Sequence, residues 1–62
     1  MRLREAAKGR VSAGGGTYRI GFDGDDETEM SAFNLAELEK LYQEFCKDNG
    51  FRQNTVDYVE RV

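Results

Sequence analysis

The most chemically distinctive segment of this chain is the acidic run DGDDETE at residues 23–29. It holds five carboxylates and no basic side chain, and no lysine or arginine follows before residue 40. Clustered carboxylates can bind a cation, transfer protons or attract a basic partner. The acids considered as candidates for such chemistry are Asp23, Asp25, Asp26, Glu27, Glu29, Glu37 and Glu39.

Calcium binding of the EF-hand type does not fit this run. A loop of that kind beginning at Asp23 would need a glycine at its sixth position and a bidentate glutamate at its twelfth. Those positions are Thr28 and Asn34. Two interpretations remain open: a solvated hairpin tip whose charges deter aggregation, or a surface that docks on a basic groove of a partner protein.

The sequence offers little for catalysis, so we expect no enzymatic activity, metal or cofactor. It contains no histidine, and a nucleophilic cysteine needs a base and a positive environment. Cys46 is therefore predicted to be a half-buried structural thiol. The glycines at 14–16 precede a predicted strand, whereas a phosphate-binding loop leads into Lys-Ser/Thr and a helix. We expect these glycines to form a linker.

The charges of the chain are unevenly distributed. Residues 1–19 carry five basic side chains and one acid, whereas the rest carries four basic side chains and eleven acids. The basic N-terminal segment raises an alternative function, contact with nucleic-acid phosphates. The residues that would make these contacts are Arg2, Arg4, Lys8 and Arg10.

The elements that must position these residues follow from the pattern of the chain. Residues 1–16 are predicted to be a basic helix or arm, with its helix over 1–8, followed by the glycine-rich linker. Residues 17–62 are predicted to be one small α+β domain. Alternating apolar residues predict strands over 17–22 and 27–33, joined at Asp23-Gly24. Gly21 within the first strand indicates a bulge or a close backbone approach.

A long helix is predicted over 35–49, where leucines and aromatic residues recur at helical spacing. Asn34 and Glu37 form a capping-box pattern at its start, and Gly50 suits its left-handed end. A third strand is predicted over 55–61. A right-handed crossover then gives an antiparallel three-stranded sheet of order 2-1-3 with the helix on one face. The other face stays open or is partly covered by the N-terminal helix.

The aromatic side chains have two possible roles in such a sheet. Tyr18, Tyr42 and Tyr58 are expected in the core or at its edge. Any tyrosine left on the open sheet face would be a natural binding anchor. Because the chain has only 62 residues, its core is thin, and self-association through the sheet is a further alternative.

The general character of residues 17–62, and DGDDETE above all, resembles that of small acidic accessory proteins of phages and mobile elements, such as anti-CRISPR and antirestriction inhibitors. The resemblance implies a non-enzymatic inhibitor that docks an acidic, DNA-mimicking surface on the nucleic-acid site of a bacterial defence nuclease, such as a CRISPR effector. The basic N-terminal segment departs from a pure DNA mimic. A lone cysteine and no evident targeting segment predict a cytoplasmic setting.

Overall fold

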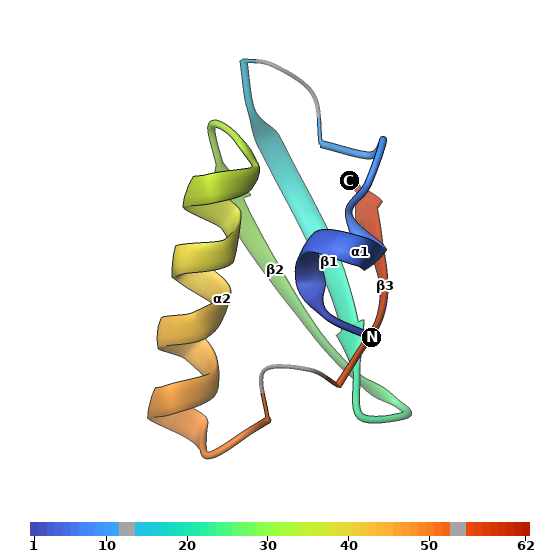
Figure 1. The fold of residues 1–62 in the computed structure, drawn as a ribbon, viewed down its shortest axis with the longest axis vertical. Helices are drawn as coiled ribbons and strands as arrows, with labels where there is room; N and C mark the ends of the chain where they lie inside the picture. The colour runs from blue at the N-terminus through green and yellow to red at the C-terminus, as the bar shows by residue number, and fades with distance from the viewer. Residues whose placement is uncertain (12–13, 53–54) are drawn as a thin grey trace.

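The computed structural model describes residues 1–11, 14–52 and 55–62, and its elements follow the predicted order. They are α1 (Leu3–Ala6), β1 (Gly16–Phe22), β2 (Asp26–Ala32), α2 (Leu35–Asn49) and β3 (Val56–Arg61) (Figure 1). The strands form one sheet of order β2-β1-β3, and both pairings are antiparallel. The predicted α+β class and strand order are confirmed. Four predicted positions, 12–13 in the linker and 53–54 before β3, lie outside the described residues.

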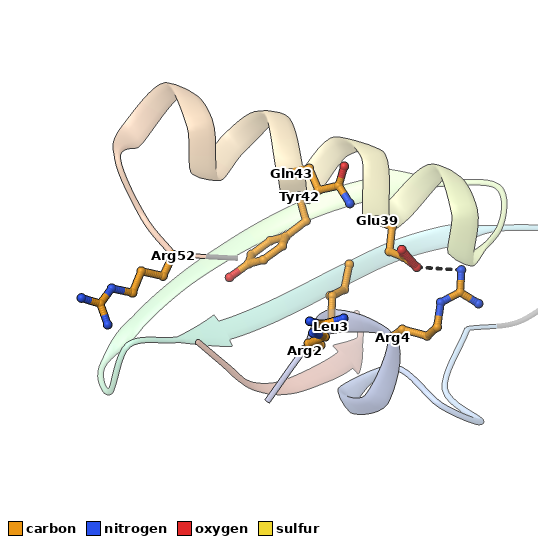
Figure 2. A pocket seen from close by; sticks show the side chains of 7 residues that line it. All are labelled: Arg2, Leu3, Arg4, Glu39, Tyr42, Gln43 and Arg52. Carbon is orange, nitrogen blue, oxygen red and sulfur yellow. Dashed lines mark ion pairs between the residues drawn. The ribbon is translucent and has the colours of Figure 1, made fainter. Parts of the chain in front are cut away.

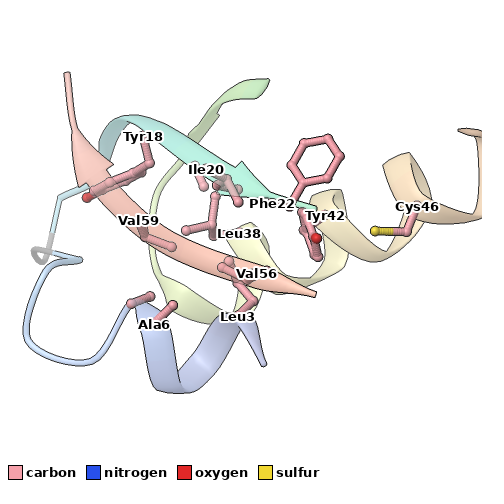
Figure 3. Close-up of a cluster of buried hydrophobic side chains, with 12 residues drawn as sticks. Leu3, Ala6, Tyr18, Ile20, Phe22, Leu38, Tyr42, Cys46, Val56 and Val59 are labelled. Carbon is pink, nitrogen blue, oxygen red and sulfur yellow. The ribbon is translucent and has the colours of Figure 1, made fainter. Parts of the chain in front are cut away.

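Both helices cover the same face of the sheet. Figure 1 shows α2 crossing beside β2 and the short α1 lying in front of β1 and β3. The buried side chains of α1 join those of α2 and the strands in one cluster (Figure 3). Neither α1 nor α2 therefore lies on the opposite sheet face (Figure 1). The core residues are Leu3, Ala6, Ala7, Tyr18, Ile20, Phe22, Ala32, Leu38, Tyr42, Cys46, Val56 and Val59.

Alternation along β1 and β2 produces this one-sided core. Tyr18, Ile20 and Phe22 are at most 2% exposed, whereas the intervening residues of β1 point to the open face. On β2, Ala32 is buried and Met30 packs against the core. Successive strand side chains point to opposite faces, so one apolar set buries one face only.

The ends of α2 are set by local hydrogen bonds, with one departure from the predicted pattern. Asn34 Oδ1 accepts from Glu37 N at 2.9 Å, as an N-cap should. Glu37 Oε1 accepts from Phe33 N at 2.8 Å, one residue earlier than the capping box predicts. Gly50 ends the helix with φ of 75°, a conformation that glycine adopts without a Cβ penalty.

An aromatic cluster closes the core at the end of α2. The ring of Phe22 lies edge-on to Tyr42, Phe45 and Phe51, at centroid distances of 6.2, 5.5 and 4.9 Å. Such pairs contribute roughly 0.5–1.5 kcal/mol each beyond the area they bury. They fix the C-terminal half of α2, including Tyr42, against β1.

The N-terminal segment is part of the packed structure. Leu3 is 4% exposed and Ala7 1%, and Met1 O accepts a hydrogen bond from Val56 N at 2.9 Å. Gly15, in the predicted linker, is also buried. A Cβ there would lie 2.5 Å from Ala32 O, so the close approach of the two backbones requires glycine. The helical part of the basic segment is therefore held on β3 rather than extending from the domain.

We predict that Leu3→Ala destabilises the protein by about 2–4 kcal/mol, because it leaves a cavity where α1 meets α2 and β3. The free energy of unfolding from urea denaturation measures this. Val62→Ala is the control, since Val62 is 63% exposed and its truncation should change stability by less than about 0.5 kcal/mol. Equal effects of the two substitutions would mean that α1 is not docked.

Candidate functional site

The sheet face opposite the two helices, called here the open face, is covered by neither α1 nor α2 (Figure 1). It is built from outward side chains of all three strands, in rows set by the strand register. Its residues are Thr17, Arg19, Gly21, Glu27, Glu29, Ser31, Tyr58 and Glu60. The face is therefore rich in carboxylates and contains one aromatic ring.

The row of the open face nearest the hairpin joins Tyr58, Gly21 and Glu27 across the three strands. Gly21 is the register partner of both other residues. A Cβ at Gly21 would lie 2.0 Å from the Tyr58 ring, so the ring covers the glycine. The Tyr58 hydroxyl donates to Glu27 Oε2 at 2.5 Å. This explains the glycine inside β1: its missing side chain makes room for the tyrosine.

A bulge in β3 is what points Tyr58 outward. Gly21 pairs with Tyr58 but Phe22 pairs with Val56, which leaves Asp57 as the extra residue. Val56 and Val59 are both fully buried although they are three positions apart. In a regular strand these two valines would face opposite sides. The bulge lets both enter the core and leaves the tyrosine on the open face.

A second row, next to the first, places one cation between two acids. Arg19 pairs in register with Glu29 on β2 and with Glu60 on β3. Its NH2 lies 3.3 Å from Glu29 Oε2. The hydrogen bond and charge of Glu29, aided by Glu27 and Glu60, raise the pKa of Arg19 above its usual value. The acidic run contains no cation of its own, but β1 brings Arg19 beside Glu29.

The hairpin tip extends the acidic surface at one end of the sheet. Asp23 and Gly24 have φ of 49° and 84°, which fits a tight hairpin turn. Gly24 N donates to Asp57 Oδ2 at 3.1 Å, so the bulge residue of β3 also holds the turn. Asp25 and Asp26 are exposed. Asp57 and Glu60 thus join the acidic surface, although they lie about thirty residues further along the chain.

Glu37 and Glu39 lie elsewhere, in the early turns of α2 at the other end of the sheet from the hairpin (Figure 1). Glu37 is occupied in capping α2. Glu39 Oε2 lies 2.8 Å from NH2 of Arg4 on α1. The seven candidate acids therefore do not form one surface: five belong to the open face and its tip, and two belong to the helix side.

The basic residues proposed for nucleic-acid contact also lie on the helix side. Arg2, Arg4, Lys8 and Arg10 are exposed around α1. Arg4 is paired with Glu39, as described above. The acidic and basic surfaces thus lie on opposite sides of the sheet.

The other residues considered for chemistry are Cys46 and the potential metal ligands. Cys46 is 1% exposed, which makes it more deeply buried than the half-buried thiol predicted. Among residues 1–11, 14–52 and 55–62, no three potential His, Cys, Asp or Glu ligands gather to hold a metal ion. Neither α1 nor α2 is long and apolar enough to cross a bilayer.

Comparison of the chain with known protein families, curated proteins and solved structures finds no significant match.

We predict that Gly21→Ala displaces the Tyr58 ring and destabilises the protein by about 1–3 kcal/mol, because the new methyl group overlaps the ring. Urea denaturation measures the change. In a Tyr58→Ala background the same substitution should cost much less, and this double-mutant cycle isolates the contact. An equal cost in both backgrounds would contradict the stacking of Tyr58 on Gly21.

The Tyr58 phenol should ionise at a higher pH than an ordinary tyrosine. The hydrogen bond to Glu27 raises its pKa, with smaller contributions from desolvation and nearby negative charge. The bond therefore contributes to stability below about pH 10 and is lost as pH rises through the raised pKa. NMR titration of the ring should show that Glu27→Gln lowers the Tyr58 pKa, whereas Glu44→Gln on α2 leaves it unchanged. A Tyr58 pKa that Glu27→Gln does not move would contradict the contact.

Proposed function

We propose that this chain is a non-enzymatic, cytoplasmic protein-binding module that docks its open face and hairpin tip on a basic surface of a partner protein. The observation that carries the proposal is an oriented tyrosine that lies over the central strand of an uncovered, acidic sheet face. The resemblance to anti-CRISPR and antirestriction inhibitors of phages and mobile elements favours a bacterial defence nuclease, such as a CRISPR effector, as the partner.

The tyrosine supports binding because it is already held in place. Tyr58 rests on Gly21 and donates to Glu27, so little side-chain entropy is lost when a partner covers it. Tyrosines at the centre of an interface often contribute much of the binding energy. Tyr58 therefore supplies the apolar anchor that a purely charged surface would lack.

The carboxylates around this anchor supply attraction and selectivity. Glu27, Glu29 and Glu60 surround the single cation Arg19 on the open face. Asp23, Asp25 and Asp26 continue the negative charge to the hairpin tip. Such a field speeds association with a basic surface and repels acidic competitors. A groove that otherwise holds nucleic-acid phosphates has the complementary charge, which is the reason to prefer it as the docking site.

The negative charge of the open face makes self-association through it less favourable than binding to a basic partner. A two-fold symmetric contact brings each patch against its own copy. Glutamates of one copy would then face those of the other, and like charges across an interface are repulsive. The charge of the face thus favours a different, basic partner over a second copy.

The test is capture of a partner from nuclease-treated bacterial lysate, followed by measured affinity for it. Asp25→Lys combined with Asp26→Lys should weaken binding about tenfold or more, because it reverses the charge at the tip. Tyr58→Ala should weaken it by a similar factor through loss of the anchor. Affinity should also fall as salt is raised.

The control is Glu44→Lys combined with Asp48→Lys, which makes the same change in net charge on the exposed side of α2. It should bind within about twofold of the parent protein, since surface charges remote from the contact matter little. Undiminished binding by both the tip and the Tyr58 variants would refute the open face as the docking surface. Capture that disappears on nuclease treatment would instead assign binding to nucleic acid and the basic segment.

A further inference from the structure

A groove between α1 and α2 lies on the side of the sheet opposite the open face. Its volume is about 590 Å³, within the range of small-molecule sites. Figure 2 shows side chains of both helices and of the segment after α2 around it. The polar residues that line it are Arg2, Arg4, Glu39, Tyr42, Gln43 and Arg52.

Two buried oxygens of this groove have no hydrogen-bond partner among the described residues, Glu39 Oε2 and the Tyr42 hydroxyl. Glu39 Oε2 has an ion pair with Arg4, whereas the Tyr42 hydroxyl has no such pairing. Tyr42 is 1% exposed, and its hydroxyl has no hydrogen-bond partner among the described residues.

Cys46 and Thr55 approach the hydroxyl closely enough to shift the pKa of Tyr42. Neither approach has the geometry of a hydrogen bond. A buried polar group without a partner is costly and uncommon in folded proteins. In Figure 2 the hydroxyl is directed to the side from which Arg52 extends.

The hydroxyl is available as a donor at neutral pH. Burial raises the pKa of Tyr42 above the ordinary tyrosine range, and Cys46 adds to the effect. The phenol therefore keeps its proton at neutral pH. Its hydroxyl can donate a hydrogen bond, and no acceptor among the described residues receives it. A ligand oxygen with free lone pairs is the complementary group.

The charge of the groove favours an anion. It contains three guanidinium groups and one carboxylate, and Arg4 pairs with Glu39 at 2.8 Å. Arg2 and Arg52 are exposed, and neither forms an ion pair with another described residue. The net charge of the lining is thus positive in a chain whose overall charge is −3. Arginine provides forked donors that match oxyanions.

We propose that this groove binds a phosphate monoester, whose oxygens accept hydrogen bonds from the Tyr42 hydroxyl and from the guanidinium groups of Arg2 and Arg52. The donors come from the residue before α1, from α2 and from the segment after α2, so each can contact a different oxygen of the ligand. A carboxylate offers only two oxygens. Because the groove and the open face lie on opposite sides of the sheet, this site is independent of the proposed docking function.

The first experiment titrates the ¹⁵N-labelled protein with sodium phosphate and, separately, with sodium chloride at equal ionic strength. Phosphate should cause saturable amide shifts at Tyr42, Gln43 and Arg52 that chloride does not reproduce. Tyr42→Phe and Arg52→Gln should each weaken phosphate binding about tenfold, the effect of losing one hydrogen bond to a charged group. Tyr42→Phe keeps the ring and its contact with Phe22, so the fold is retained.

Lys47→Gln is the matched control for Arg52→Gln, because it removes one exposed positive charge near the end of α2 without altering the groove lining. It should leave phosphate affinity unchanged. Equal shifts with chloride, or wild-type affinity in both Tyr42→Phe and Arg52→Gln, would overturn the site.

Two further ligands distinguish the source of the phosphate. Adenosine 5′-monophosphate represents a small-molecule monoester, and a single-stranded oligonucleotide with and without a 5′-phosphate represents a nucleic-acid end. Tighter binding of the mononucleotide than of inorganic phosphate would support a free nucleotide. Binding of the oligonucleotide only when it carries the 5′-phosphate would support a nucleic-acid end. Equal binding of both oligonucleotides, with no response to the mononucleotide, would overturn the monoester site.

Discussion

The position of β1 at the centre of the sheet is the constraint on which the rest of the structure depends. Its inward side chains, Tyr18, Ile20 and Phe22, form the floor of the core onto which both helices pack. Its outward positions set the pattern of the open face. Gly21 in particular ties the two sides together, because the same short segment that places Phe22 in the core also leaves space for Tyr58 outside.

The small size of the chain explains why only one sheet face is covered. A chain of 62 residues buries only a limited amount of apolar surface. Here the buried residues of both helices and of the strands all belong to a single core. The uncovered face must then tolerate water, which its charged residues allow. Charges on β2, an edge strand, also discourage pairing with other chains. A face that is polar for these structural reasons also has the charge to attract a basic partner. Its solubility does not require an aromatic side chain, so Tyr58 is the residue that solubility does not explain.

Acidic and basic side chains that are unevenly distributed along the sequence form separate surfaces on opposite sides of the sheet in the fold. The acids of β2, the hairpin and β3 gather around the open face, whereas Arg2 and Arg4 of the N-terminal segment join Arg52 beside the groove. The sheet lies between the two surfaces. The basic segment, which departs from the character of a pure DNA mimic, therefore does not neutralise the acidic face. Each surface keeps its own electrostatic character and can be altered without changing the other.

The sequence by itself determined the elements, the strand order and the ends of α2, because alternation, helical spacing and capping are local signals. Only the tertiary structure decided which charged groups meet. The contacts Arg19–Glu29, Arg4–Glu39 and Tyr58–Glu27 depend on strand register, on the β3 bulge and on the docking of α1. The register, the bulge and the docking of α1 depend on which apolar residues from distant parts of the chain pack into the core. For example, burial of both Val56 and Val59 leaves Asp57 as the unpaired bulge residue. No local pattern contains that information.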